Sequence, residues 1–61
     1  MEELLKLAKI TKENHPYLLF DVDSILSECI YWVDQGRDED LETSTAIDNI
    51  NSLIKQSEEW L

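Results

Sequence analysis

The segment from Leu18 to Val33 is the part of the chain that most constrains its fold. Apolar residues fall at positions 18, 19, 22, 25, 26, 29, 30, 32 and 33, and steps of three and four predict a helix. The apolar arc is wider than the roughly 100° stripe that a helix with a single neighbour needs. Such a helix requires neighbours on two flanks, in a chain of only 61 residues. The pattern therefore predicts a partner beyond the single chain.

Three helices are predicted in all, and this segment belongs to the second. The first covers residues 2–13 and ends before Pro16, because the residue that precedes a proline avoids the helical region. The second covers residues 16–35, with Asn14 or His15 as its N-cap. It ends at Gly36, which suits a left-handed residue after a helix. The third covers residues 41–60, with Asp40 as its N-cap.

A later start of the second helix is the alternative. If residues 17–20 were extended, Asp21 or Asp23 would be the cap.

The predicted fold class is all-α, with a short N-terminal helix followed by an antiparallel helical hairpin in one domain, residues 1–61. The hairpin follows from the short connection between the second and third helices. A domain of about 60 residues is marginally stable alone, so we expect two copies to assemble as a dimeric helical bundle with twofold symmetry. The residues expected in the core or dimer interface are Leu18, Leu19, Val22, Ile25, Leu26, Cys29, Ile30, Trp32, Val33, Ile50 and Ile54.

The net charge restricts the classes of partner. Fourteen acids and five bases give a charge of −9. This balance argues against direct binding of nucleic acid, whose phosphates need Lys and Arg, and against anionic membranes. It fits either a protein with a basic surface or simple solubility. The apolar runs are far shorter than the roughly 20 residues of a membrane span, and the acidic start is unlike a signal peptide. With the single cysteine, these features predict a cytoplasmic location.

One motif resembles that of an enzyme family. Residues 17–26, Tyr-Leu-Leu-Phe-Asp-Val-Asp-Ser-Ile-Leu, resemble the first motif of the haloacid dehalogenase phosphohydrolases. The resemblance implies a phosphoryl-accepting Asp21, a general acid/base Asp23 and a Mg²⁺ cofactor. That fold also needs several βα units of about 30 residues each, and only 35 residues follow the motif. The helical periodicity accounts for the same letters, so both aspartates are expected on the solvent side of a helix.

Other chemical sites are not predicted. A calcium-binding EF-hand loop starting at Asp34 would need Gly at its sixth position and Glu at its twelfth, where Glu39 and Thr45 stand. His15 has no nucleophile at a known spacing, and Cys29 has no basic neighbour that would lower its pKa. We therefore expect no enzyme activity, no metal and no cofactor, and we expect Cys29 to be a buried packing residue.

The aromatic residues leave an alternative open. Tyr17, Phe20 and Tyr31 share a third face of the second helix. We expect the first helix to cover them as core, and otherwise they form an exposed surface that suits a protein partner. Trp60 and Leu61 are interpreted as either an anchor across a dimer interface or a frayed tail.

These observations favour a small acidic interaction module with a regulatory role that binds a protein partner as a homodimer. The partner is expected to have a basic surface and to be bound by Asp38, Glu39, Glu42 and Tyr31. The alternatives are a structural homo-oligomeric assembly element and a phage or plasmid accessory inhibitor. The accessory inhibitor would imitate nucleic acid on a basic host protein.

Overall fold

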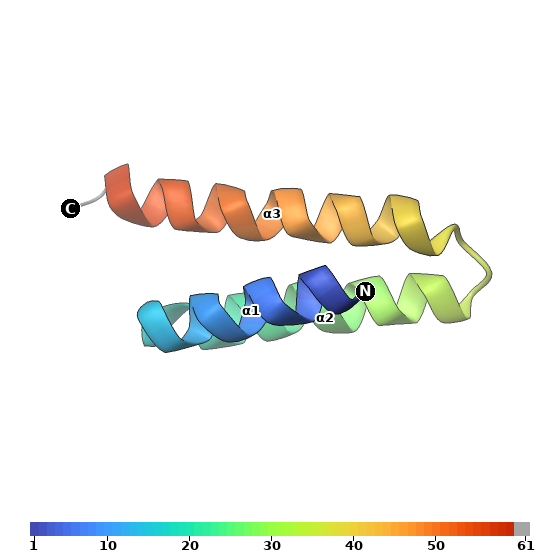
Figure 1. Cartoon of the computed structure of the whole chain (residues 1–61), viewed down its shortest axis with the longest axis horizontal. Helices are drawn as coiled ribbons and strands as arrows, with labels where there is room; N and C mark the ends of the chain where they lie inside the picture. Colours follow the sequence, from blue (N-terminus) through green and yellow to red (C-terminus); the bar gives the residue numbers. More distant parts are fainter. Residues whose placement is uncertain (60–61) are drawn as a thin grey trace.

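The protein is an all-helical, three-helix bundle, as the sequence predicts. The computed structural model describes residues 1–59. The elements are α1 (Glu2–Asn14), a short 3-10 helix η1 (Pro16–Leu18), α2 (Leu19–Asp34) and α3 (Glu39–Glu59). Figure 1 shows α1 and α3 running in the same direction, while α2, which lies between them in the sequence, runs in the opposite direction. Within the described range, no helix combines the length and the apolar character needed to cross a membrane.

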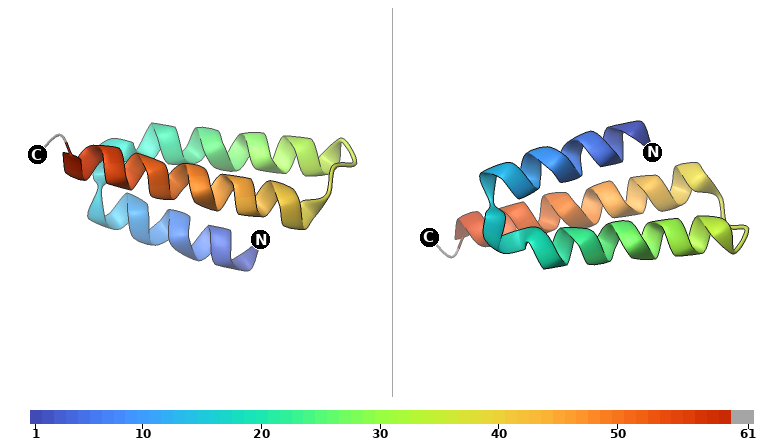
Figure 2. Two further views of the ribbon diagram at one scale, coloured as in Figure 1. Left: turned by 90° about the horizontal axis from the view of Figure 1, so that it is seen from above. Right: turned by 90° about the horizontal axis from the view of Figure 1, so that it is seen from below.

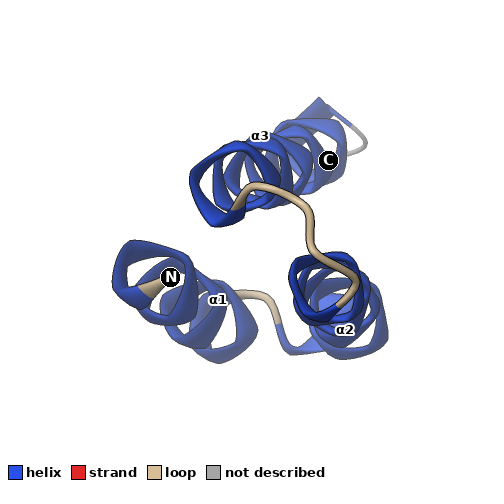
Figure 3. Cartoon of the chain, turned by 90° about the vertical axis from the view of Figure 1, so that its right-hand side faces the viewer, coloured by secondary structure: helices blue, strands red, loops and turns tan. Residues whose placement is uncertain are grey.

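The three helices are arranged as a triangle when the bundle is viewed along its axis (Figure 3). Every helix packs against the other two, and the views from above and below show α1 lying alongside the α2–α3 hairpin (Figure 2). The bundle measures 39 × 17 × 17 Å. Helices α1 and α3 flank α2 and cover much of both flanks within one chain, but Leu19 and Ile30 on one flank remain exposed.

The predicted second helix is divided at its start. Pro16 opens the 3-10 turn, and α2 proper begins at Leu19. His15 precedes the turn with φ −133° and ψ 71°, outside the helical region, as expected of a residue before proline. His15 is the N-cap residue of this turn, one of the two residues predicted, but its side chain makes no capping hydrogen bond. The backbone closes the turn instead, because the Leu18 N–H donates to the His15 carbonyl at 2.9 Å.

The predicted end of the second helix at Gly36 is confirmed. Gly36 has φ +96°, a left-handed conformation that suits a residue without a Cβ atom. The Arg37 N–H donates to the Trp32 carbonyl at 3.1 Å, and the Gly36 N–H donates to the Val33 carbonyl at 3.0 Å. This pair of bonds is a Schellman motif, which satisfies two of the last carbonyls of α2.

The predicted N-cap of the third helix is wrong by two residues. Asp38 is the cap, since its Oδ1 accepts the Leu41 N–H at 3.1 Å and its carbonyl accepts the Glu42 N–H at 3.0 Å. Asp40 instead lies in the first turn of the helix and is exposed. A capping side chain must lie two or three residues before the N–H whose hydrogen bond it accepts, so the earlier helix start selects Asp38.

The core is formed by one small residue set contributed by all three helices. It contains the buried apolar residues Leu4, Ala8, Leu18, Val22, Cys29, Ala46 and Ile50. Thr11 is also buried, and its hydroxyl donates to the Leu7 carbonyl at 2.7 Å. The side chains of α1 therefore close a core that the hairpin alone would leave open.

The residues expected in a core or dimer interface separate into three groups. Leu18, Val22, Cys29 and Ile50 are buried within the single chain, and Ile25, Leu26, Trp32, Val33 and Ile54 are half-buried. Leu19 and Ile30 are exposed, at 42% and 47%. Leu19 and Ile30 are therefore the two members of this set whose side chains are exposed enough for another molecule to cover them.

Candidate protein-interaction surfaces

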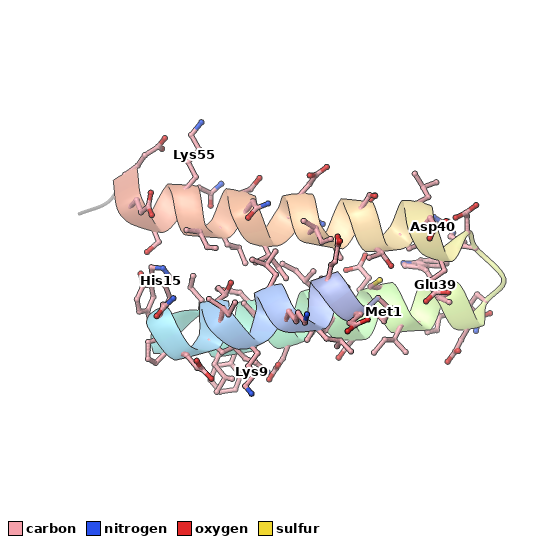
Figure 4. All side chains as sticks on the ribbon, in the orientation of Figure 1. Met1, Lys9, His15, Glu39, Asp40 and Lys55 are labelled. Atoms are coloured by element: carbon pink, nitrogen blue, oxygen red, sulfur yellow. The ribbon has the colours of Figure 1, made fainter. Side chains whose placement is uncertain are left out.

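The charge of the protein is unevenly distributed over its helices. Helix α1 carries three lysines and three glutamates, whereas the remainder of the chain has two bases and eleven acids. The whole net charge of −9 therefore lies outside α1. In Figure 4, Lys9 and Lys55 point away from the bundle on opposite sides, while Glu39 and Asp40 lie together at the α2–α3 turn. The turn is the most acidic end of the molecule.

The three acids expected to bind a partner have different environments at this turn. The Asp38 carboxylate caps α3. The Glu42 carboxylate is 3.5 Å from the Arg37 guanidinium, and its side chain is only 14% exposed. Glu39 is exposed and makes no ion pair within residues 1–59. Together with the neighbouring exposed Asp40, it is the acid most available to a partner.

A groove lies between α2 and α3 beside this turn. Its volume is about 360 Å³. The lining combines an apolar floor with a polar rim and consists of Ile25, Glu28, Cys29, Trp32, Arg37, Leu41, Glu42, Thr45, Ala46 and Asn49. Leu41 is 65% exposed, so a large apolar side chain stands free among acids. The periodicity of α2 contains no signal for this groove, which depends on how α3 packs beside it.

Trp32 and Arg37 organise the wall of the groove. The Arg37 guanidinium lies 4.1 Å from the centre of the Trp32 ring, within the range of a cation–π contact. The Schellman motif positions both residues, since the Arg37 N–H donates to the Trp32 carbonyl. Tyr31 meets Trp32 edge to face, with ring centres 5.0 Å apart, but does not line the groove. Tyr31 therefore lies at the same end of the bundle as the acids without sharing their groove.

The aromatic face of α2 is exposed, which corrects the expectation that the first helix covers it. Phe20 is 82% exposed, Tyr31 54% and Tyr17 62%. Helix α1 packs on the side of α2 that carries Asp23, where the Lys12 ammonium lies 3.2 Å from the carboxylate. The tight turn at His15 and Pro16 returns the chain to that side, and α1 leaves Phe20 and Tyr31 uncovered.

At the opposite end of the bundle, three polar side chains link α3 to the first turn. His15 Nδ1 is 2.9 Å from the Tyr17 hydroxyl, which in turn bonds to the Ser57 hydroxyl. The His15 and Tyr17 rings meet edge to face, and Figure 4 shows His15 beside the C-terminal part of α3. Sequence reasoning missed this link because Tyr17 and Ser57 are 40 positions apart. We interpret it as a tether between elements.

The phosphohydrolase-like motif lies in helix, not in a strand. Its residues 17–26 span η1 and the first half of α2. Asp21 and Asp23 are exposed, as the helical interpretation predicts. Across residues 1–59, no group of three or more His, Cys, Asp or Glu side chains is placed to hold a metal ion.

Cys29 is buried between α2 and α3, as predicted, and is 4% exposed. Burial raises the pKa of the Cys29 thiol, and the nearby carboxylates of Glu42 and Glu39 act in the same direction, whereas the Thr43 hydroxyl and the N-terminal ammonium oppose them. The buried Thr43 Oγ1 has no hydrogen-bond partner of normal geometry among the described residues. The thiol is thus protonated and enclosed, which suits packing and not reactivity.

Comparisons with known proteins found no match from which a family or a function could be assigned. No protein-family model matches the chain, and no curated protein or solved structure matches it either. Trp60 and Leu61, interpreted above as an anchor or a tail, lie outside the described residues.

Proposed function

We propose that the protein is a small acidic interaction module with a regulatory role, which binds a protein partner as a homodimer in the cytoplasm. The groove between α2 and α3 is the binding site in this proposal. The acids of the neighbouring α2–α3 turn attract a basic surface, and the apolar residues of the groove accept a hydrophobic side chain of the partner. Of the partner-binding residues named from the sequence, Glu42 lines the groove, and Asp38 and Glu39 precede it at the start of α3.

The observation that carries the proposal is the exposed Leu41 among acidic residues. Leu41 is exposed on the groove while Glu39 and Asp40 directly precede it. An apolar centre with a charged rim is the usual anatomy of a protein interface. Charge at the rim acts mainly on the association rate and is screened over about 8–10 Å at physiological ionic strength. Salt should therefore slow association more than it speeds dissociation.

The experiment compares capture by two charge variants. The protein is immobilised in three forms: wild type, Glu39→Gln/Asp40→Asn, and the control Glu58→Gln/Glu59→Gln. Each variant removes two exposed charges from α3, the first at the start of the helix and the control at its end. The proposal is supported if the wild type and the control both retain a protein, while Glu39→Gln/Asp40→Asn fails to retain it and high salt releases it. Equal retention by all three forms would contradict it.

A structural homo-oligomeric element is the second candidate, and the exposed aromatic face of α2 favours it. In that case the acids serve solubility, and sedimentation would show large self-assemblies that persist in the turn variant. Imitation of nucleic acid requires regularly spaced carboxylates, whereas those of α3 cluster at residues 39–42 and 58–59 with Asp48 alone between them. The accessory-inhibitor alternative therefore has less support.

A further inference from the structure

We infer that the exposed face of α2 binds a second copy of the same chain, with the two α2 helices antiparallel and a twofold axis near residue 25. This inference rests on the homodimer of the proposed function and gives it a specific interface. It does not involve the groove beside the α2–α3 turn. The face is defined by the exposed apolar residues Leu19, Phe20, Ile30 and Tyr31.

The spacing of these residues is self-complementary. Leu19 and Ile30 are eleven positions apart, as are Phe20 and Tyr31, and eleven residues make about three helical turns. Each end of α2 therefore presents an adjacent apolar pair on the same side of the helix. When a second α2 lies antiparallel with its centre at residue 25, the Leu19–Phe20 pair of one copy meets the Ile30–Tyr31 pair of the other. The twofold axis repeats that cluster at the other end, as an isologous interface requires.

The middle of the face is suited to close approach of two helices. Ser24 and Ser27 lie between the two apolar pairs, and both are small. Asp23 is the charged residue nearest the centre of this face, and Lys12 of α1 partly neutralises it at 3.2 Å. In the antiparallel register, Asp23 lies level with Ser27 of the second copy, whose hydroxyl is a hydrogen-bond donor. The central charge is thus compensated by an ion pair within one chain and a donor from the other.

Helix α1 extends the same surface. Leu5 precedes Lys12 by seven residues, and Ile30 follows Asp23 by seven. The Lys12–Asp23 contact shows that these two residues lie level in the antiparallel helices, so Leu5 lies level with Ile30 on the same side. Leu5 is itself 50% exposed. The surface therefore includes five of the eight exposed large hydrophobic residues in the described part of the chain.

The area of this surface approaches what a stable dimer needs. A buried aromatic side chain covers about 150–250 Å², so the exposed parts of Phe20 and Tyr31 would alone contribute roughly 250 Å² per protomer. A standard interface takes about 800 Å² from each partner. The two rings would supply about a third of that area, and Leu5, Leu19, Ile30 and the serines add to it. A chain with a total surface of 4536 Å² offers this much on one face.

Sedimentation equilibrium of the chain at micromolar concentration tests the inference. We expect the wild type to be dimeric and Phe20→Glu to weaken the dimer by more than about a hundredfold, because a carboxylate then enters an apolar contact at both ends. Since Phe20 is largely exposed, the helix content of the variant should not change in circular dichroism. Ile10→Glu is the control and should remain dimeric, because it introduces the same charge at an exposed apolar residue of α1 that belongs neither to this face nor to the groove.

A mixture of two variants tests the antiparallel orientation. Phe20→Glu and Tyr31→Lys should each be monomeric alone, and equal amounts of both should form a heterodimer in which the introduced glutamate of one chain meets the introduced lysine of the other. Parallel helices would not bring these two positions together. A monomeric wild type, a Phe20→Glu dimer or no recovery in the mixture would each overturn the inference. None of these outcomes depends on the acidic turn, so the groove proposal is tested separately.

Discussion

Removal of the Asp38 cap should destabilise the protein more than removal of the neighbouring Asp40 carboxylate. Asp38 accepts the Leu41 N–H at 3.1 Å, and loss of such a cap by substitution with alanine costs about 1 kcal/mol. A chain of 61 residues has a total unfolding free energy of roughly 3–9 kcal/mol. The cap therefore supplies a measurable fraction of the stability.

The expected change in melting temperature follows from the chain length. At about 2.1 cal/mol/K per residue, the unfolding entropy of 61 residues is about 0.13 kcal/mol/K. A loss of 1 kcal/mol therefore lowers the melting temperature by about 8 °C. Asp38→Asn should lower it much less, because asparagine caps as well as aspartate does.

Thermal and urea unfolding followed by far-UV circular dichroism provide the assay. Asp38→Ala, Asp38→Asn and Asp40→Ala are compared at one protein concentration, because a dimer would make the transition concentration-dependent. If Asp40→Ala were the more destabilising change, or if Asp38→Asn lost as much as Asp38→Ala, the assignment of the cap would be refuted.

Three further outcomes are expected. The Cys29 thiol should react slowly with a thiol reagent, and burial raises the pKa of this thiol in the folded state. The free energy of unfolding should therefore be unchanged below the ordinary thiol pKa and should fall as pH rises above it. Urea unfolding of Cys29→Ala, compared at neutral and alkaline pH, should lack that loss. Arg37→Ala should cost about 0.5–1 kcal/mol in urea unfolding through loss of the contact with Trp32, and an unchanged midpoint would contradict this. Ile25→Asp should abolish the cooperative unfolding transition because Ile25 packs against the core. Ile30→Asp should keep its helix content because Ile30 is exposed. If both variants were unfolded, the packing assigned to α2 would be wrong.

The sequence predicted the parts of the fold that depend on local chemistry. The spacing of apolar residues in 18–33 was sufficient to place a helix where a ten-residue motif resembles the strand of a phosphohydrolase. Gly36 was sufficient to end it, because few other residues adopt a positive φ. Both signals act within a few positions of the chain, so neither requires knowledge of the neighbouring helices.

The parts that depend on the direction of packing were not predictable. Phe20 lies on a third face of α2, nearly opposite the fully buried Val22, and it is exposed. The periodicity separated these two faces but did not show whether α1 would cover the third one. The side on which α1 returns decides this, and His15 and Pro16 set that direction through backbone geometry. Asp38 and Asp40 are equally good capping residues by type, so a shift of two positions in the helix start exchanged their roles. The candidate groove was missed for the same reason, since its walls come from two helices.

The turn between α2 and α3 also bears on the order in which the chain folds. The bonds that end α2 and the bond that begins α3 each join residues no more than five positions apart, so they form without closing a long loop. Contacts made by α1 with α3 join segments far apart in the sequence and carry a larger loop-closure entropy. We therefore expect the α2–α3 hairpin to form first and α1 to dock last. In native-state hydrogen exchange, the amides of α1 would then open at a lower free energy than those of α2.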